Sequence, residues 1–179
     1  MTSIFIRSAC ESDIQSITDI YAYYVQHSSI SFELTPPDVP EMAKRLTQIT
    51  DLRLPYLVAE VDDQIVGYAY AALYRTRAAY RFTVEDSIYV RPTHRGKGVG
   101  ESLLPLLITK CEEAGYRQMV AVIGGDDNTA SIRFHKKFGF NQCGLLEGVG
   151  YKFGHWVNTV LLQKPLGLGA TTVINPGDI

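Results

Sequence analysis

A glycine-rich segment in the middle of the chain could bind an anionic ligand. Residues 94–101 read His-Arg-Gly-Lys-Gly-Val-Gly-Glu and follow the apolar run 88–90. Glycines let a ligand approach the backbone, and the first amides of a helix present unpaired N–H groups and the positive end of the helix dipole to a phosphate. Arg95 and Lys97 add positive charge at the same point. The segment therefore predicts a strand, a phosphate-binding turn and a helix.

The spacing of these glycines disfavours two common phosphate-binding motifs. A P-loop would need Ser or Thr directly after its lysine, but Gly98 follows Lys97 here. A dinucleotide-binding fingerprint would need Gly-x-Gly-x-x-Gly and an acidic residue about 20 residues further on. This run is Gly-x-Gly-x-Gly, and the downstream stretch 119–123 is apolar. A nucleotidase and a dinucleotide-binding protein are therefore both disfavoured.

The remaining match is to a coenzyme A-binding motif. Arg95, Gly98 and Gly100 fit the pattern Arg/Gln-x-x-Gly-x-Gly/Ala, which resembles the pyrophosphate loop of the GNAT superfamily of N-acetyltransferases. About 30 residues further on, the stretch from Asn128 to Gly139 resembles the second signature of that superfamily, in which an Asn begins a helix and a Gly-Phe pair ends it. The resemblance implies acetyl-CoA as co-substrate, with these binding residues: Ile88, Tyr89, Val90, Arg95, Gly96, Lys97, Gly98, Val99, Gly100, Glu101 and Asn128.

One branch of the superfamily resembles the chain over residues 3–165. Residues 75–90, together with 56–62, 120–124 and 150–156, are similar to the phosphinothricin N-acetyltransferases and to the methionine sulfoximine and methionine sulfone acetyltransferases. His135 adds to this resemblance, because many superfamily members have Tyr at that position. The resemblance implies acetylation of a small amino acid by direct attack, and it implies a homodimer. It does not choose among the three acceptors.

Acetyl transfer to an amine requires a base, because an α-amino group with a pKa of about 7.7–8.0 is largely protonated at neutral pH. Glu85 is the candidate, since it precedes the expected coenzyme-binding strand and could act directly or through one water. Along an extended strand Glu85 and Ser87 point to one face, whereas Asp86 points to the other. Glu85 could also be a solvated or salt-bridged strand carboxylate. Only one of the two acids can face the acceptor.

Two further groups could assist the transfer. A backbone N–H from a splayed strand, that of Ile88 or Val90, could stabilise the oxyanion. His135 could protonate the departing thiolate, because imidazole titrates near neutrality. It could equally form a hydrogen bond to the pantetheine arm or pack in the core. We therefore predict Glu85 and His135 as the catalytic side chains and leave the role of His135 open.

Recognition of the acceptor is assigned to a cluster of arginines before the coenzyme-binding strand. Arg75, Arg77 and Arg81 lie close together in the sequence, and guanidinium groups bind carboxylates and other oxygen-rich groups in bidentate fashion. They could instead be solvated loop charges or form salt bridges between subunits. The predicted acceptor site comprises Arg75, Thr76, Arg77, Tyr80, Glu85, Asp86 and Ser87.

Two other functions remain open. A coenzyme A-binding sensor module could use the same cradle without turnover, but it would have no need of Glu85. An enzyme acting on protein amino termini or lysines would favour an open acidic groove over a pocket with arginines, so the cluster at 75–81 speaks against it.

Composition restricts the class of protein. The chain has 179 residues, 46% of them hydrophobic and 20% charged, which fits a domain at 1–165 and a mobile tail at 166–179. A net charge of −2 disfavours nucleic-acid binding, and the lack of a signal peptide or long apolar run favours a cytoplasmic protein without membrane contact. The three cysteines form no Cys-x-x-Cys pair, so no disulfide framework and no metal are expected. We interpret all three as buried apolar residues.

Periodicity places these residues on alternating strands and helices of an α/β fold. The superfamily resemblance implies a mixed, mostly antiparallel sheet with helices on both faces. It also implies a central strand pair that splays apart, here between 87–90 and 119–123. Helices are expected after Ser12-Asp13, at 40–49, at 98–114 and after Asn128, and strands at 4–6, 56–61, 65–73, 84–90, 119–123, 140–145 and 156–162.

Overall fold

The computed structural model describes residues 3–125 and 127–174. Its elements agree with the expected ones, apart from longer sixth and seventh strands and short 3-10 turns. In chain order they are β1 (Phe5–Ser8), η1 (Glu11–Asp13), α1 (Ile14–His27), α2 (Val39–Asp51), β2 (Tyr56–Val61), β3 (Gln64–Leu73), η2 (Ala78–Tyr80), β4 (Thr83–Val90), η3 (Pro92–His94), α3 (Val99–Glu113), β5 (Gln118–Gly124), α4 (Thr129–Lys137), β6 (Asn141–Lys152) and β7 (His155–Pro165).

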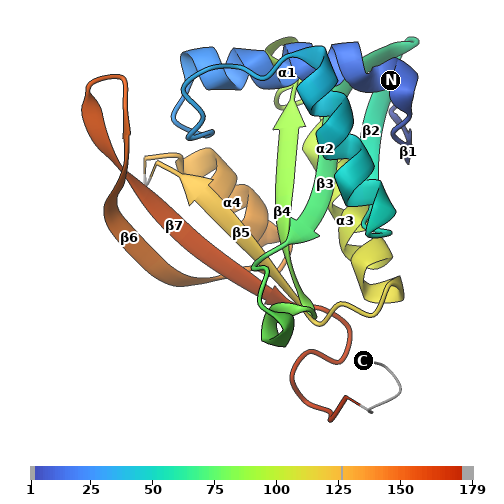
Figure 1. Ribbon diagram of the computed structural model, residues 1–179, viewed down its shortest axis with the longest axis vertical. Coiled ribbons are helices and arrows are strands. Elements are labelled where there is room, and N and C mark those ends of the chain that lie inside the picture. Colours follow the sequence, from blue (N-terminus) through green and yellow to red (C-terminus); the bar gives the residue numbers. More distant parts are fainter. Residues whose placement is uncertain (1–2, 126, 175–179) are drawn as a thin grey trace.

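The strands form one seven-stranded sheet in the order β1-β2-β3-β4-β5-β7-β6. Every neighbouring pair is antiparallel except β4 and β5. In Figure 1, α1 and α2 lie on one side of this sheet, and α3 and α4 lie on the other. The predicted fold class, a mostly antiparallel sheet between two layers of helices, is therefore confirmed.

Alternation along the central strands builds a separate core on each face of the sheet. On β2, Leu57 packs into the core under α3, whereas Tyr56 and Val58 pack into the core under α1 and α2. On β3, Ala69 packs into the core under α3, and Tyr68 packs into the core under α1 and α2. Successive side chains of a strand point to opposite faces, so strands with cores on both sides are apolar without interruption. This rigid centre carries the residues that the sequence singled out.

The central pair β4 and β5 separates partway along its length. The two strands pair in parallel from Thr83 opposite Gln118 to Asp86 opposite Ala121, and Figure 1 shows them diverging beyond that point. The expected splay is therefore present, although it begins later on β5 than predicted, because 119–121 still pair with β4. A narrow hollow of about 50 Å³ lies where the strands part.

Local backbone geometry explains why the two motifs need their glycines and asparagine. Gly98, the residue before α3, has φ +85°, a conformation that favours glycine. Before α4, the Asn128 side chain accepts a hydrogen bond from the Ser131 amide at 3.4 Å, so it caps the helix as predicted. Gly139, just after α4, has φ +86°. Each motif therefore fixes the start or end of a helix beside the splay.

Two peripheral predictions can be compared with the structure. Only Cys111 is buried, whereas Cys10 and Cys143 are exposed, so the interpretation of all three as buried residues was wrong. Cys143 lies on β6, an edge strand, and Cys10 lies in the turn after β1. In the predicted mobile tail, Leu166 is fully buried, and residues 175–179 lie outside the described residues.

Gly124, at the end of β5, holds the loop between α1 and α2 against the sheet. A Cβ at this position would lie 2.4 Å from the Ser29 carbonyl oxygen and 2.9 Å from the Phe32 ring. Gly124→Ala should therefore displace the loop backbone and lower the free energy of unfolding by about 1–3 kcal/mol, measured by chemical denaturation. Gly144→Ala is the matched control, because its Cβ would be 3.6 Å from its nearest neighbour. Equal stability of the two variants would contradict this account.

Candidate active site

A cradle at the start of α3 gathers most of the residues predicted to bind the coenzyme. It is a hollow of about 290 Å³. Its floor is the outer part of β4, and its sides are the glycine turn, α4 and α1. Of the predicted residues, those that line it are Ile88, Val90, Arg95, Gly96, Val99, Gly100, Glu101 and Asn128.

The cradle fits the phosphate groups of a coenzyme. Gly96 has φ +71° and would meet nothing within 4 Å if it carried a Cβ, so the turn is open to a ligand. The N-terminus of α3 supplies backbone N–H groups, and Arg95 supplies a cation beside them. Gly98 provides the turn geometry and Lys97 is exposed near it. Tyr89 is the exception, because it lies on the opposite face of β4 from the cradle.

Sequence reasoning missed several residues of the cradle, and Tyr24 is the most important of them. The Tyr24 hydroxyl donates a hydrogen bond to the Val90 carbonyl and accepts one from the Arg95 Nε at 3.2 Å. Tyr24 lies on α1, and the expected helix after Ser12-Asp13 gave no indication that it would lie over the splay. His94 also lines the cradle, as do Ile30, Ala130, Ser131 and Phe134.

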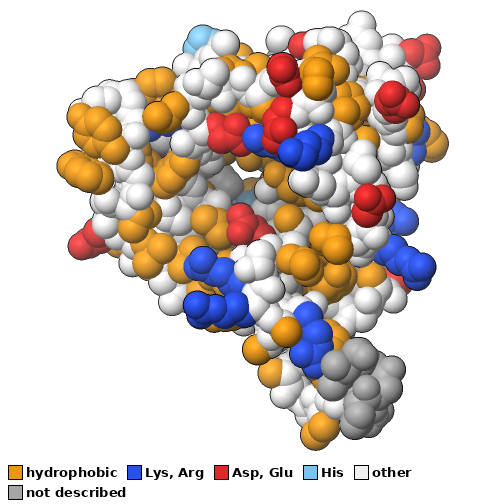
Figure 2. All heavy atoms as spheres, viewed as in Figure 1, with side chains coloured by type: hydrophobic (Ala, Val, Ile, Leu, Met, Phe, Trp, Pro, Cys, Tyr) orange, Lys and Arg blue, Asp and Glu red, His pale blue; other side chains and the backbone are white. Residues whose placement is uncertain are grey.

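A second hollow, of about 500 Å³, lies on the other face of β4 and could hold the acceptor. Figure 2 shows the surface hollowed near its centre, between the α1–α2 side and the arm formed by β6 and β7. Glu85 and Ser87 face this hollow, as the alternation along the strand predicted. The other lining residues, none of them predicted, are Tyr21, Ile30, Ser31, Phe32, Glu33, Tyr70, Val122, Gly124 and Thr159, with Tyr89 completing the wall.

Glu85 is electrostatically suited to be a base. Burial, with a smaller contribution from the negative charge of Asp86 and against the positive charge of Arg75, raises the pKa of Glu85 to about 7. A carboxylate with such a pKa is ionised in a large fraction at neutral pH and yet accepts a proton readily. A fully solvated strand carboxylate would keep its ordinary pKa, so the structure favours the functional interpretation of Glu85.

The wall beneath the α1–α2 loop is held by a network of polar contacts. Tyr21 donates a hydrogen bond to Glu33 at 2.9 Å, and Arg45 pairs with the same carboxylate at 2.6 Å. Lys152, which is 4% exposed, donates to the Ser31 carbonyl at 2.6 Å. The loop is therefore tied both to the helices and to the end of β6.

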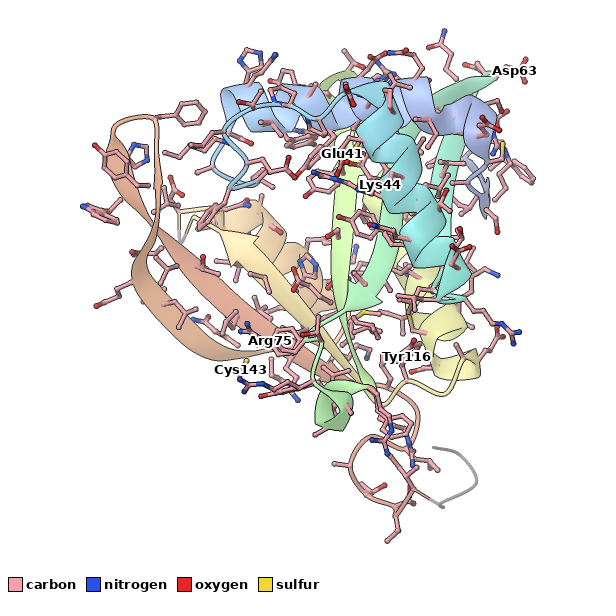
Figure 3. The ribbon with its side chains drawn as sticks, in the orientation of Figure 1. Glu41, Lys44, Asp63, Arg75, Tyr116 and Cys143 are labelled. Carbon is pink, nitrogen blue, oxygen red and sulfur yellow. The ribbon has the colours of Figure 1, made fainter. Side chains whose placement is uncertain are left out.

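The predicted arginine cluster does not converge on one point. Figure 3 shows Arg75 at the end of the sheet where β3 leads into β4, and its charge acts on Glu85. Thr76 and Arg77 are exposed loop residues, and Tyr80, 43% exposed, packs edge-on against Tyr74. Arg81 stacks on Phe82 and lines a different hollow, near the C-terminal end of α3. Of the cluster, only Arg75 is electrostatically coupled to Glu85.

Asp86 and His135 form a buried pair instead of facing the acceptor. The Asp86 Oδ2 lies 3.0 Å from the His135 Nε2, and the two side chains are 1% and 3% exposed. Asp86 was grouped with the acceptor residues, and this was wrong, because strand alternation turns it away from Glu85. The His135 Nδ1 lies 2.8 Å from the Ser131 carbonyl oxygen, so it carries a proton. Both ring nitrogens are therefore engaged within the protein.

Burial and the neighbouring Asp86 act in opposite directions on the pKa of His135. Burial alone would lower the pKa of His135, but the hydrogen bond and the charge of Asp86 together raise it above its ordinary value. The Asp86 Oδ1 is buried and has no hydrogen-bond partner among the described residues. Both side chains line the narrow hollow where β4 and β5 part.

Together these features define a class of protein: an acyltransferase with a coenzyme cradle on one side of a splayed strand and an acceptor pocket on the other. The model of the acetyltransferase (GNAT) domain matches residues 6–161. The chain therefore belongs to the GNAT acetyltransferase family, as its two motifs predicted.

Similar proteins narrow the position of the chain within this family. The chain is 49% identical over 168 residues to a phosphinothricin N-acetyltransferase of Alcaligenes faecalis, covering 94% of this chain and 85% of that one. It is 36% identical to an L-methionine sulfoximine/L-methionine sulfone acetyltransferase of Salmonella typhimurium, covering 90% and 94%. A crystal structure of a phosphinothricin acetyltransferase from Sinorhizobium meliloti in complex with AcCoA superposes with a TM-score of 0.94 at 44% identity, covering 99% and 95%.

The described residues can also be compared with the requirements of a metal site and of a membrane-spanning helix. Among residues 3–125 and 127–174, no group of three or more His, Cys, Asp or Glu side chains is arranged to hold a metal ion. No helix within those same ranges is both long enough and apolar enough to cross a membrane.

The raised pKa of Glu85 predicts a pH-dependent stability. The folded-state pKa is about 7, against 4.5 as the ordinary value. Between these values the folded state holds more protons, so the contribution of Glu85 to stability is full below pH 4.5 and is lost as pH rises through 7. At pH 8 the ionised Glu85 should lower the free energy of unfolding by about 3 kcal/mol relative to its value in acid.

Glu85→Gln should therefore unfold at a higher temperature than the wild type at pH 8, with a much smaller difference at pH 5. Thermal unfolding of both proteins at the two pH values measures this gap. A gap that does not change with pH would mean that Glu85 titrates like a solvated carboxylate.

Proposed function

We propose that the protein transfers the acetyl group of acetyl-CoA to the α-amino group of a small amino acid. The observation that supports this most directly is the position of Glu85. Its carboxylate faces the acceptor hollow from the same strand whose other face forms the coenzyme cradle. A base on the dividing strand can therefore act on an amine that approaches the acetyl group from the opposite side.

In this mechanism the protein contributes a base and an oriented amide. Glu85 takes a proton from the ammonium of the acceptor, directly or through one water, which leaves a nucleophilic amine. The Arg91 amide bonds to the Val66 carbonyl on β3, whereas the Val90 amide turns toward Tyr24. By the same alternation the Ile88 N–H points into the splay. We propose that this N–H donates a hydrogen bond to the acetyl oxygen, which gains negative charge during the attack.

Acetyl-CoA supplies the activated acetyl group. The chain would hold its phosphates at the start of α3 and at Arg95. We assign His135 a structural and electrostatic role in the splay, because both its nitrogens bind protein groups. Of the roles left open by the sequence, packing within the protein agrees best with these contacts.

The acceptor hollow favours a small zwitterion with a polar head. Its tyrosine and serine hydroxyls can bind the oxygens of a phosphinate, sulfoximine or sulfone. Arg75 does not line the hollow, but its charge acts on Glu85 there and would also attract a carboxylate. The names of the similar proteins support phosphinothricin, methionine sulfoximine and methionine sulfone as acceptors. The requirement for acetyl-CoA also favours the cytoplasm as the site of the reaction.

We further propose that the protein is a homodimer that uses the arm formed by β6 and β7. Apolar side chains gather on this arm in Figure 2, on the left of the view. Val149, Tyr151, Phe153 and Trp156 are 54%, 58%, 56% and 69% exposed. Exposed apolar patches of this kind mark protein interfaces. Tyr151 and Trp156 are too exposed to belong to the core of one chain, and a dimer seam would cover them.

The proposed reaction is tested by release of free coenzyme thiol from acetyl-CoA. Phosphinothricin, methionine sulfoximine, methionine sulfone and a lysine peptide would each be offered as acceptor. We expect release with at least one of the three amino acids and a fall in kcat/KM near pH 7 as the pH is lowered. Glu85→Gln should lose about 10²–10⁴-fold in turnover.

Glu147→Gln is the control for this loss, because Glu147 is an exposed strand glutamate on β6. Release with the lysine peptide alone would favour an enzyme that acts on proteins. Coenzyme binding without release for any acceptor would favour a sensor module. Full activity of Glu85→Gln would exclude Glu85 as the base.

The proposed dimer is tested by light scattering. We expect the wild type to have twice the mass of the chain and the double variant Tyr151→Glu, Trp156→Glu to be monomeric, because two charges would be buried in the seam. Phe5→Glu is the control, since Phe5 is 61% exposed on β1 at the other edge of the sheet. A monomeric wild type would refute the dimer without affecting the proposed reaction.

A further inference from the structure

Beyond Asp86, the edge of β4 that faces away from β3 forms hydrogen bonds with a side chain of the same chain. On one side the strand pairs with β3 as far as Val90, and on the other side β5 has diverged. Antiparallel pairing leaves the N–H and C=O of alternate residues facing away from the neighbour. For Val90 these groups face Tyr24, whose hydroxyl donates to the carbonyl and lies 3.4 Å from the amide nitrogen.

The Tyr24 hydroxyl is fully committed at this edge. A hydroxyl group has one hydrogen to donate and two lone pairs to accept. Its hydrogen goes to the Val90 carbonyl, and its lone pairs accept from the Val90 amide and from the Arg95 Nε at 3.2 Å. The Arg95 guanidinium also stacks on the Tyr24 and Tyr23 rings, at 4.9 Å and 5.8 Å.

The same groups line the coenzyme cradle. Tyr24, Val90 and Arg95 all face the hollow at the start of α3. An extended ligand with amide groups that enters between two diverging strands pairs with the open strand edge, as an added strand would. A backbone amide has a single hydrogen. The Val90 N–H therefore serves either the Tyr24 hydroxyl or an amide of the ligand, but not both.

We propose that Tyr24 is a placeholder for the coenzyme arm: its hydroxyl holds the edge of β4 at Val90 and is displaced when the arm binds. Tyr24 is only 5% exposed, and its ring packs edge-on against Tyr89 at 5.3 Å. A hydroxyl displaced from Val90 would lose its hydrogen bonds without gaining free access to water. Binding of the coenzyme arm is therefore weakened by the free energy of the hydrogen bonds that the Tyr24 hydroxyl loses.

Removal of that oxygen should strengthen binding of the arm. Tyr24→Phe keeps the ring and its contacts, and it should bind coenzyme A about five- to tenfold more tightly in calorimetry, which corresponds to the net worth of one hydrogen bond. Tyr23→Phe is the matched control, because Tyr23 stacks on Arg95 in the same way and makes no hydrogen bond to Val90 that the structure describes. Its affinity should equal that of the wild type.

Two fragments of the coenzyme separate the arm from the nucleotide. Pantetheine should gain affinity for Tyr24→Phe, whereas adenosine 3′,5′-bisphosphate, which lacks the arm, should not. A gain shared by the bisphosphate would overturn the placeholder and assign the effect to release of Arg95. Unchanged or weaker binding of coenzyme A by Tyr24→Phe would also overturn it, and would make Tyr24 a supporting contact of the coenzyme.

This inference rests on coenzyme A as the ligand of the proposed function, but it can fail separately. If the wild type binds no coenzyme A, the proposed function itself is refuted. A wild type that binds it, with a Tyr24→Phe variant of equal affinity, would refute only the placeholder. The thermal midpoint of the free variant should fall below that of the wild type, because Val90 then loses its internal partner, and an unchanged midpoint would count against the proposal.

Discussion

The divergence of β4 from β5 is the constraint on which the site depends. As long as the two strands pair, the sheet is continuous and both of its faces are covered by apolar cores. Beyond Asp86 and Ala121 the ladder ends, and the peptide groups of β4 face a gap. Unpaired buried peptide groups are unfavourable, so this gap must be filled by something that can form hydrogen bonds. A side chain from α1 and an extended substrate both meet that requirement, which explains why a helix hydroxyl and a coenzyme arm would compete for one place.

The divergence also decides the roles of two adjacent acids. Glu85 and Asp86 both lie in the last paired segment of β4, and strand alternation sends them to opposite faces. Glu85 enters the acceptor hollow, where partial burial raises its pKa. Asp86 enters the narrow hollow beneath the splay, where His135 compensates its charge. Two identical functional groups at neighbouring positions thus become the proposed base and the buried partner of His135, because their environments differ. The negative charge of Asp86 also contributes to the raised pKa of Glu85, so the two faces are not electrostatically independent.

The sequence predicted the parts of this site that follow from local rules. The glycine turn, the Asn128 cap and the alternation on β4 depend on residues within a few positions of one another, and all three are found in the structure. The acceptor wall does not follow from such rules. Ser31 and Lys152 are 121 residues apart and meet only because the α1–α2 loop lies over the end of β6. The arginine cluster misled for the same reason: proximity in sequence suggested convergence, but Arg81 lines a hollow near the C-terminal end of α3, whereas Arg75 acts on Glu85 through its charge.

Helix α1 provides a physical link between the two halves of the site. Tyr21 lines the acceptor hollow and Tyr24, one turn later, lines the coenzyme cradle. Both rings pack against Tyr89, with centroids 5.1 Å and 5.3 Å away. Because close-packed interiors transmit strain, displacement of Tyr24 at the strand edge would act on Tyr89 and, through it, on Tyr21, whose hydroxyl donates a hydrogen bond to Glu33. The two hollows therefore border one packed cluster of tyrosines, with β4 lying between the hollows.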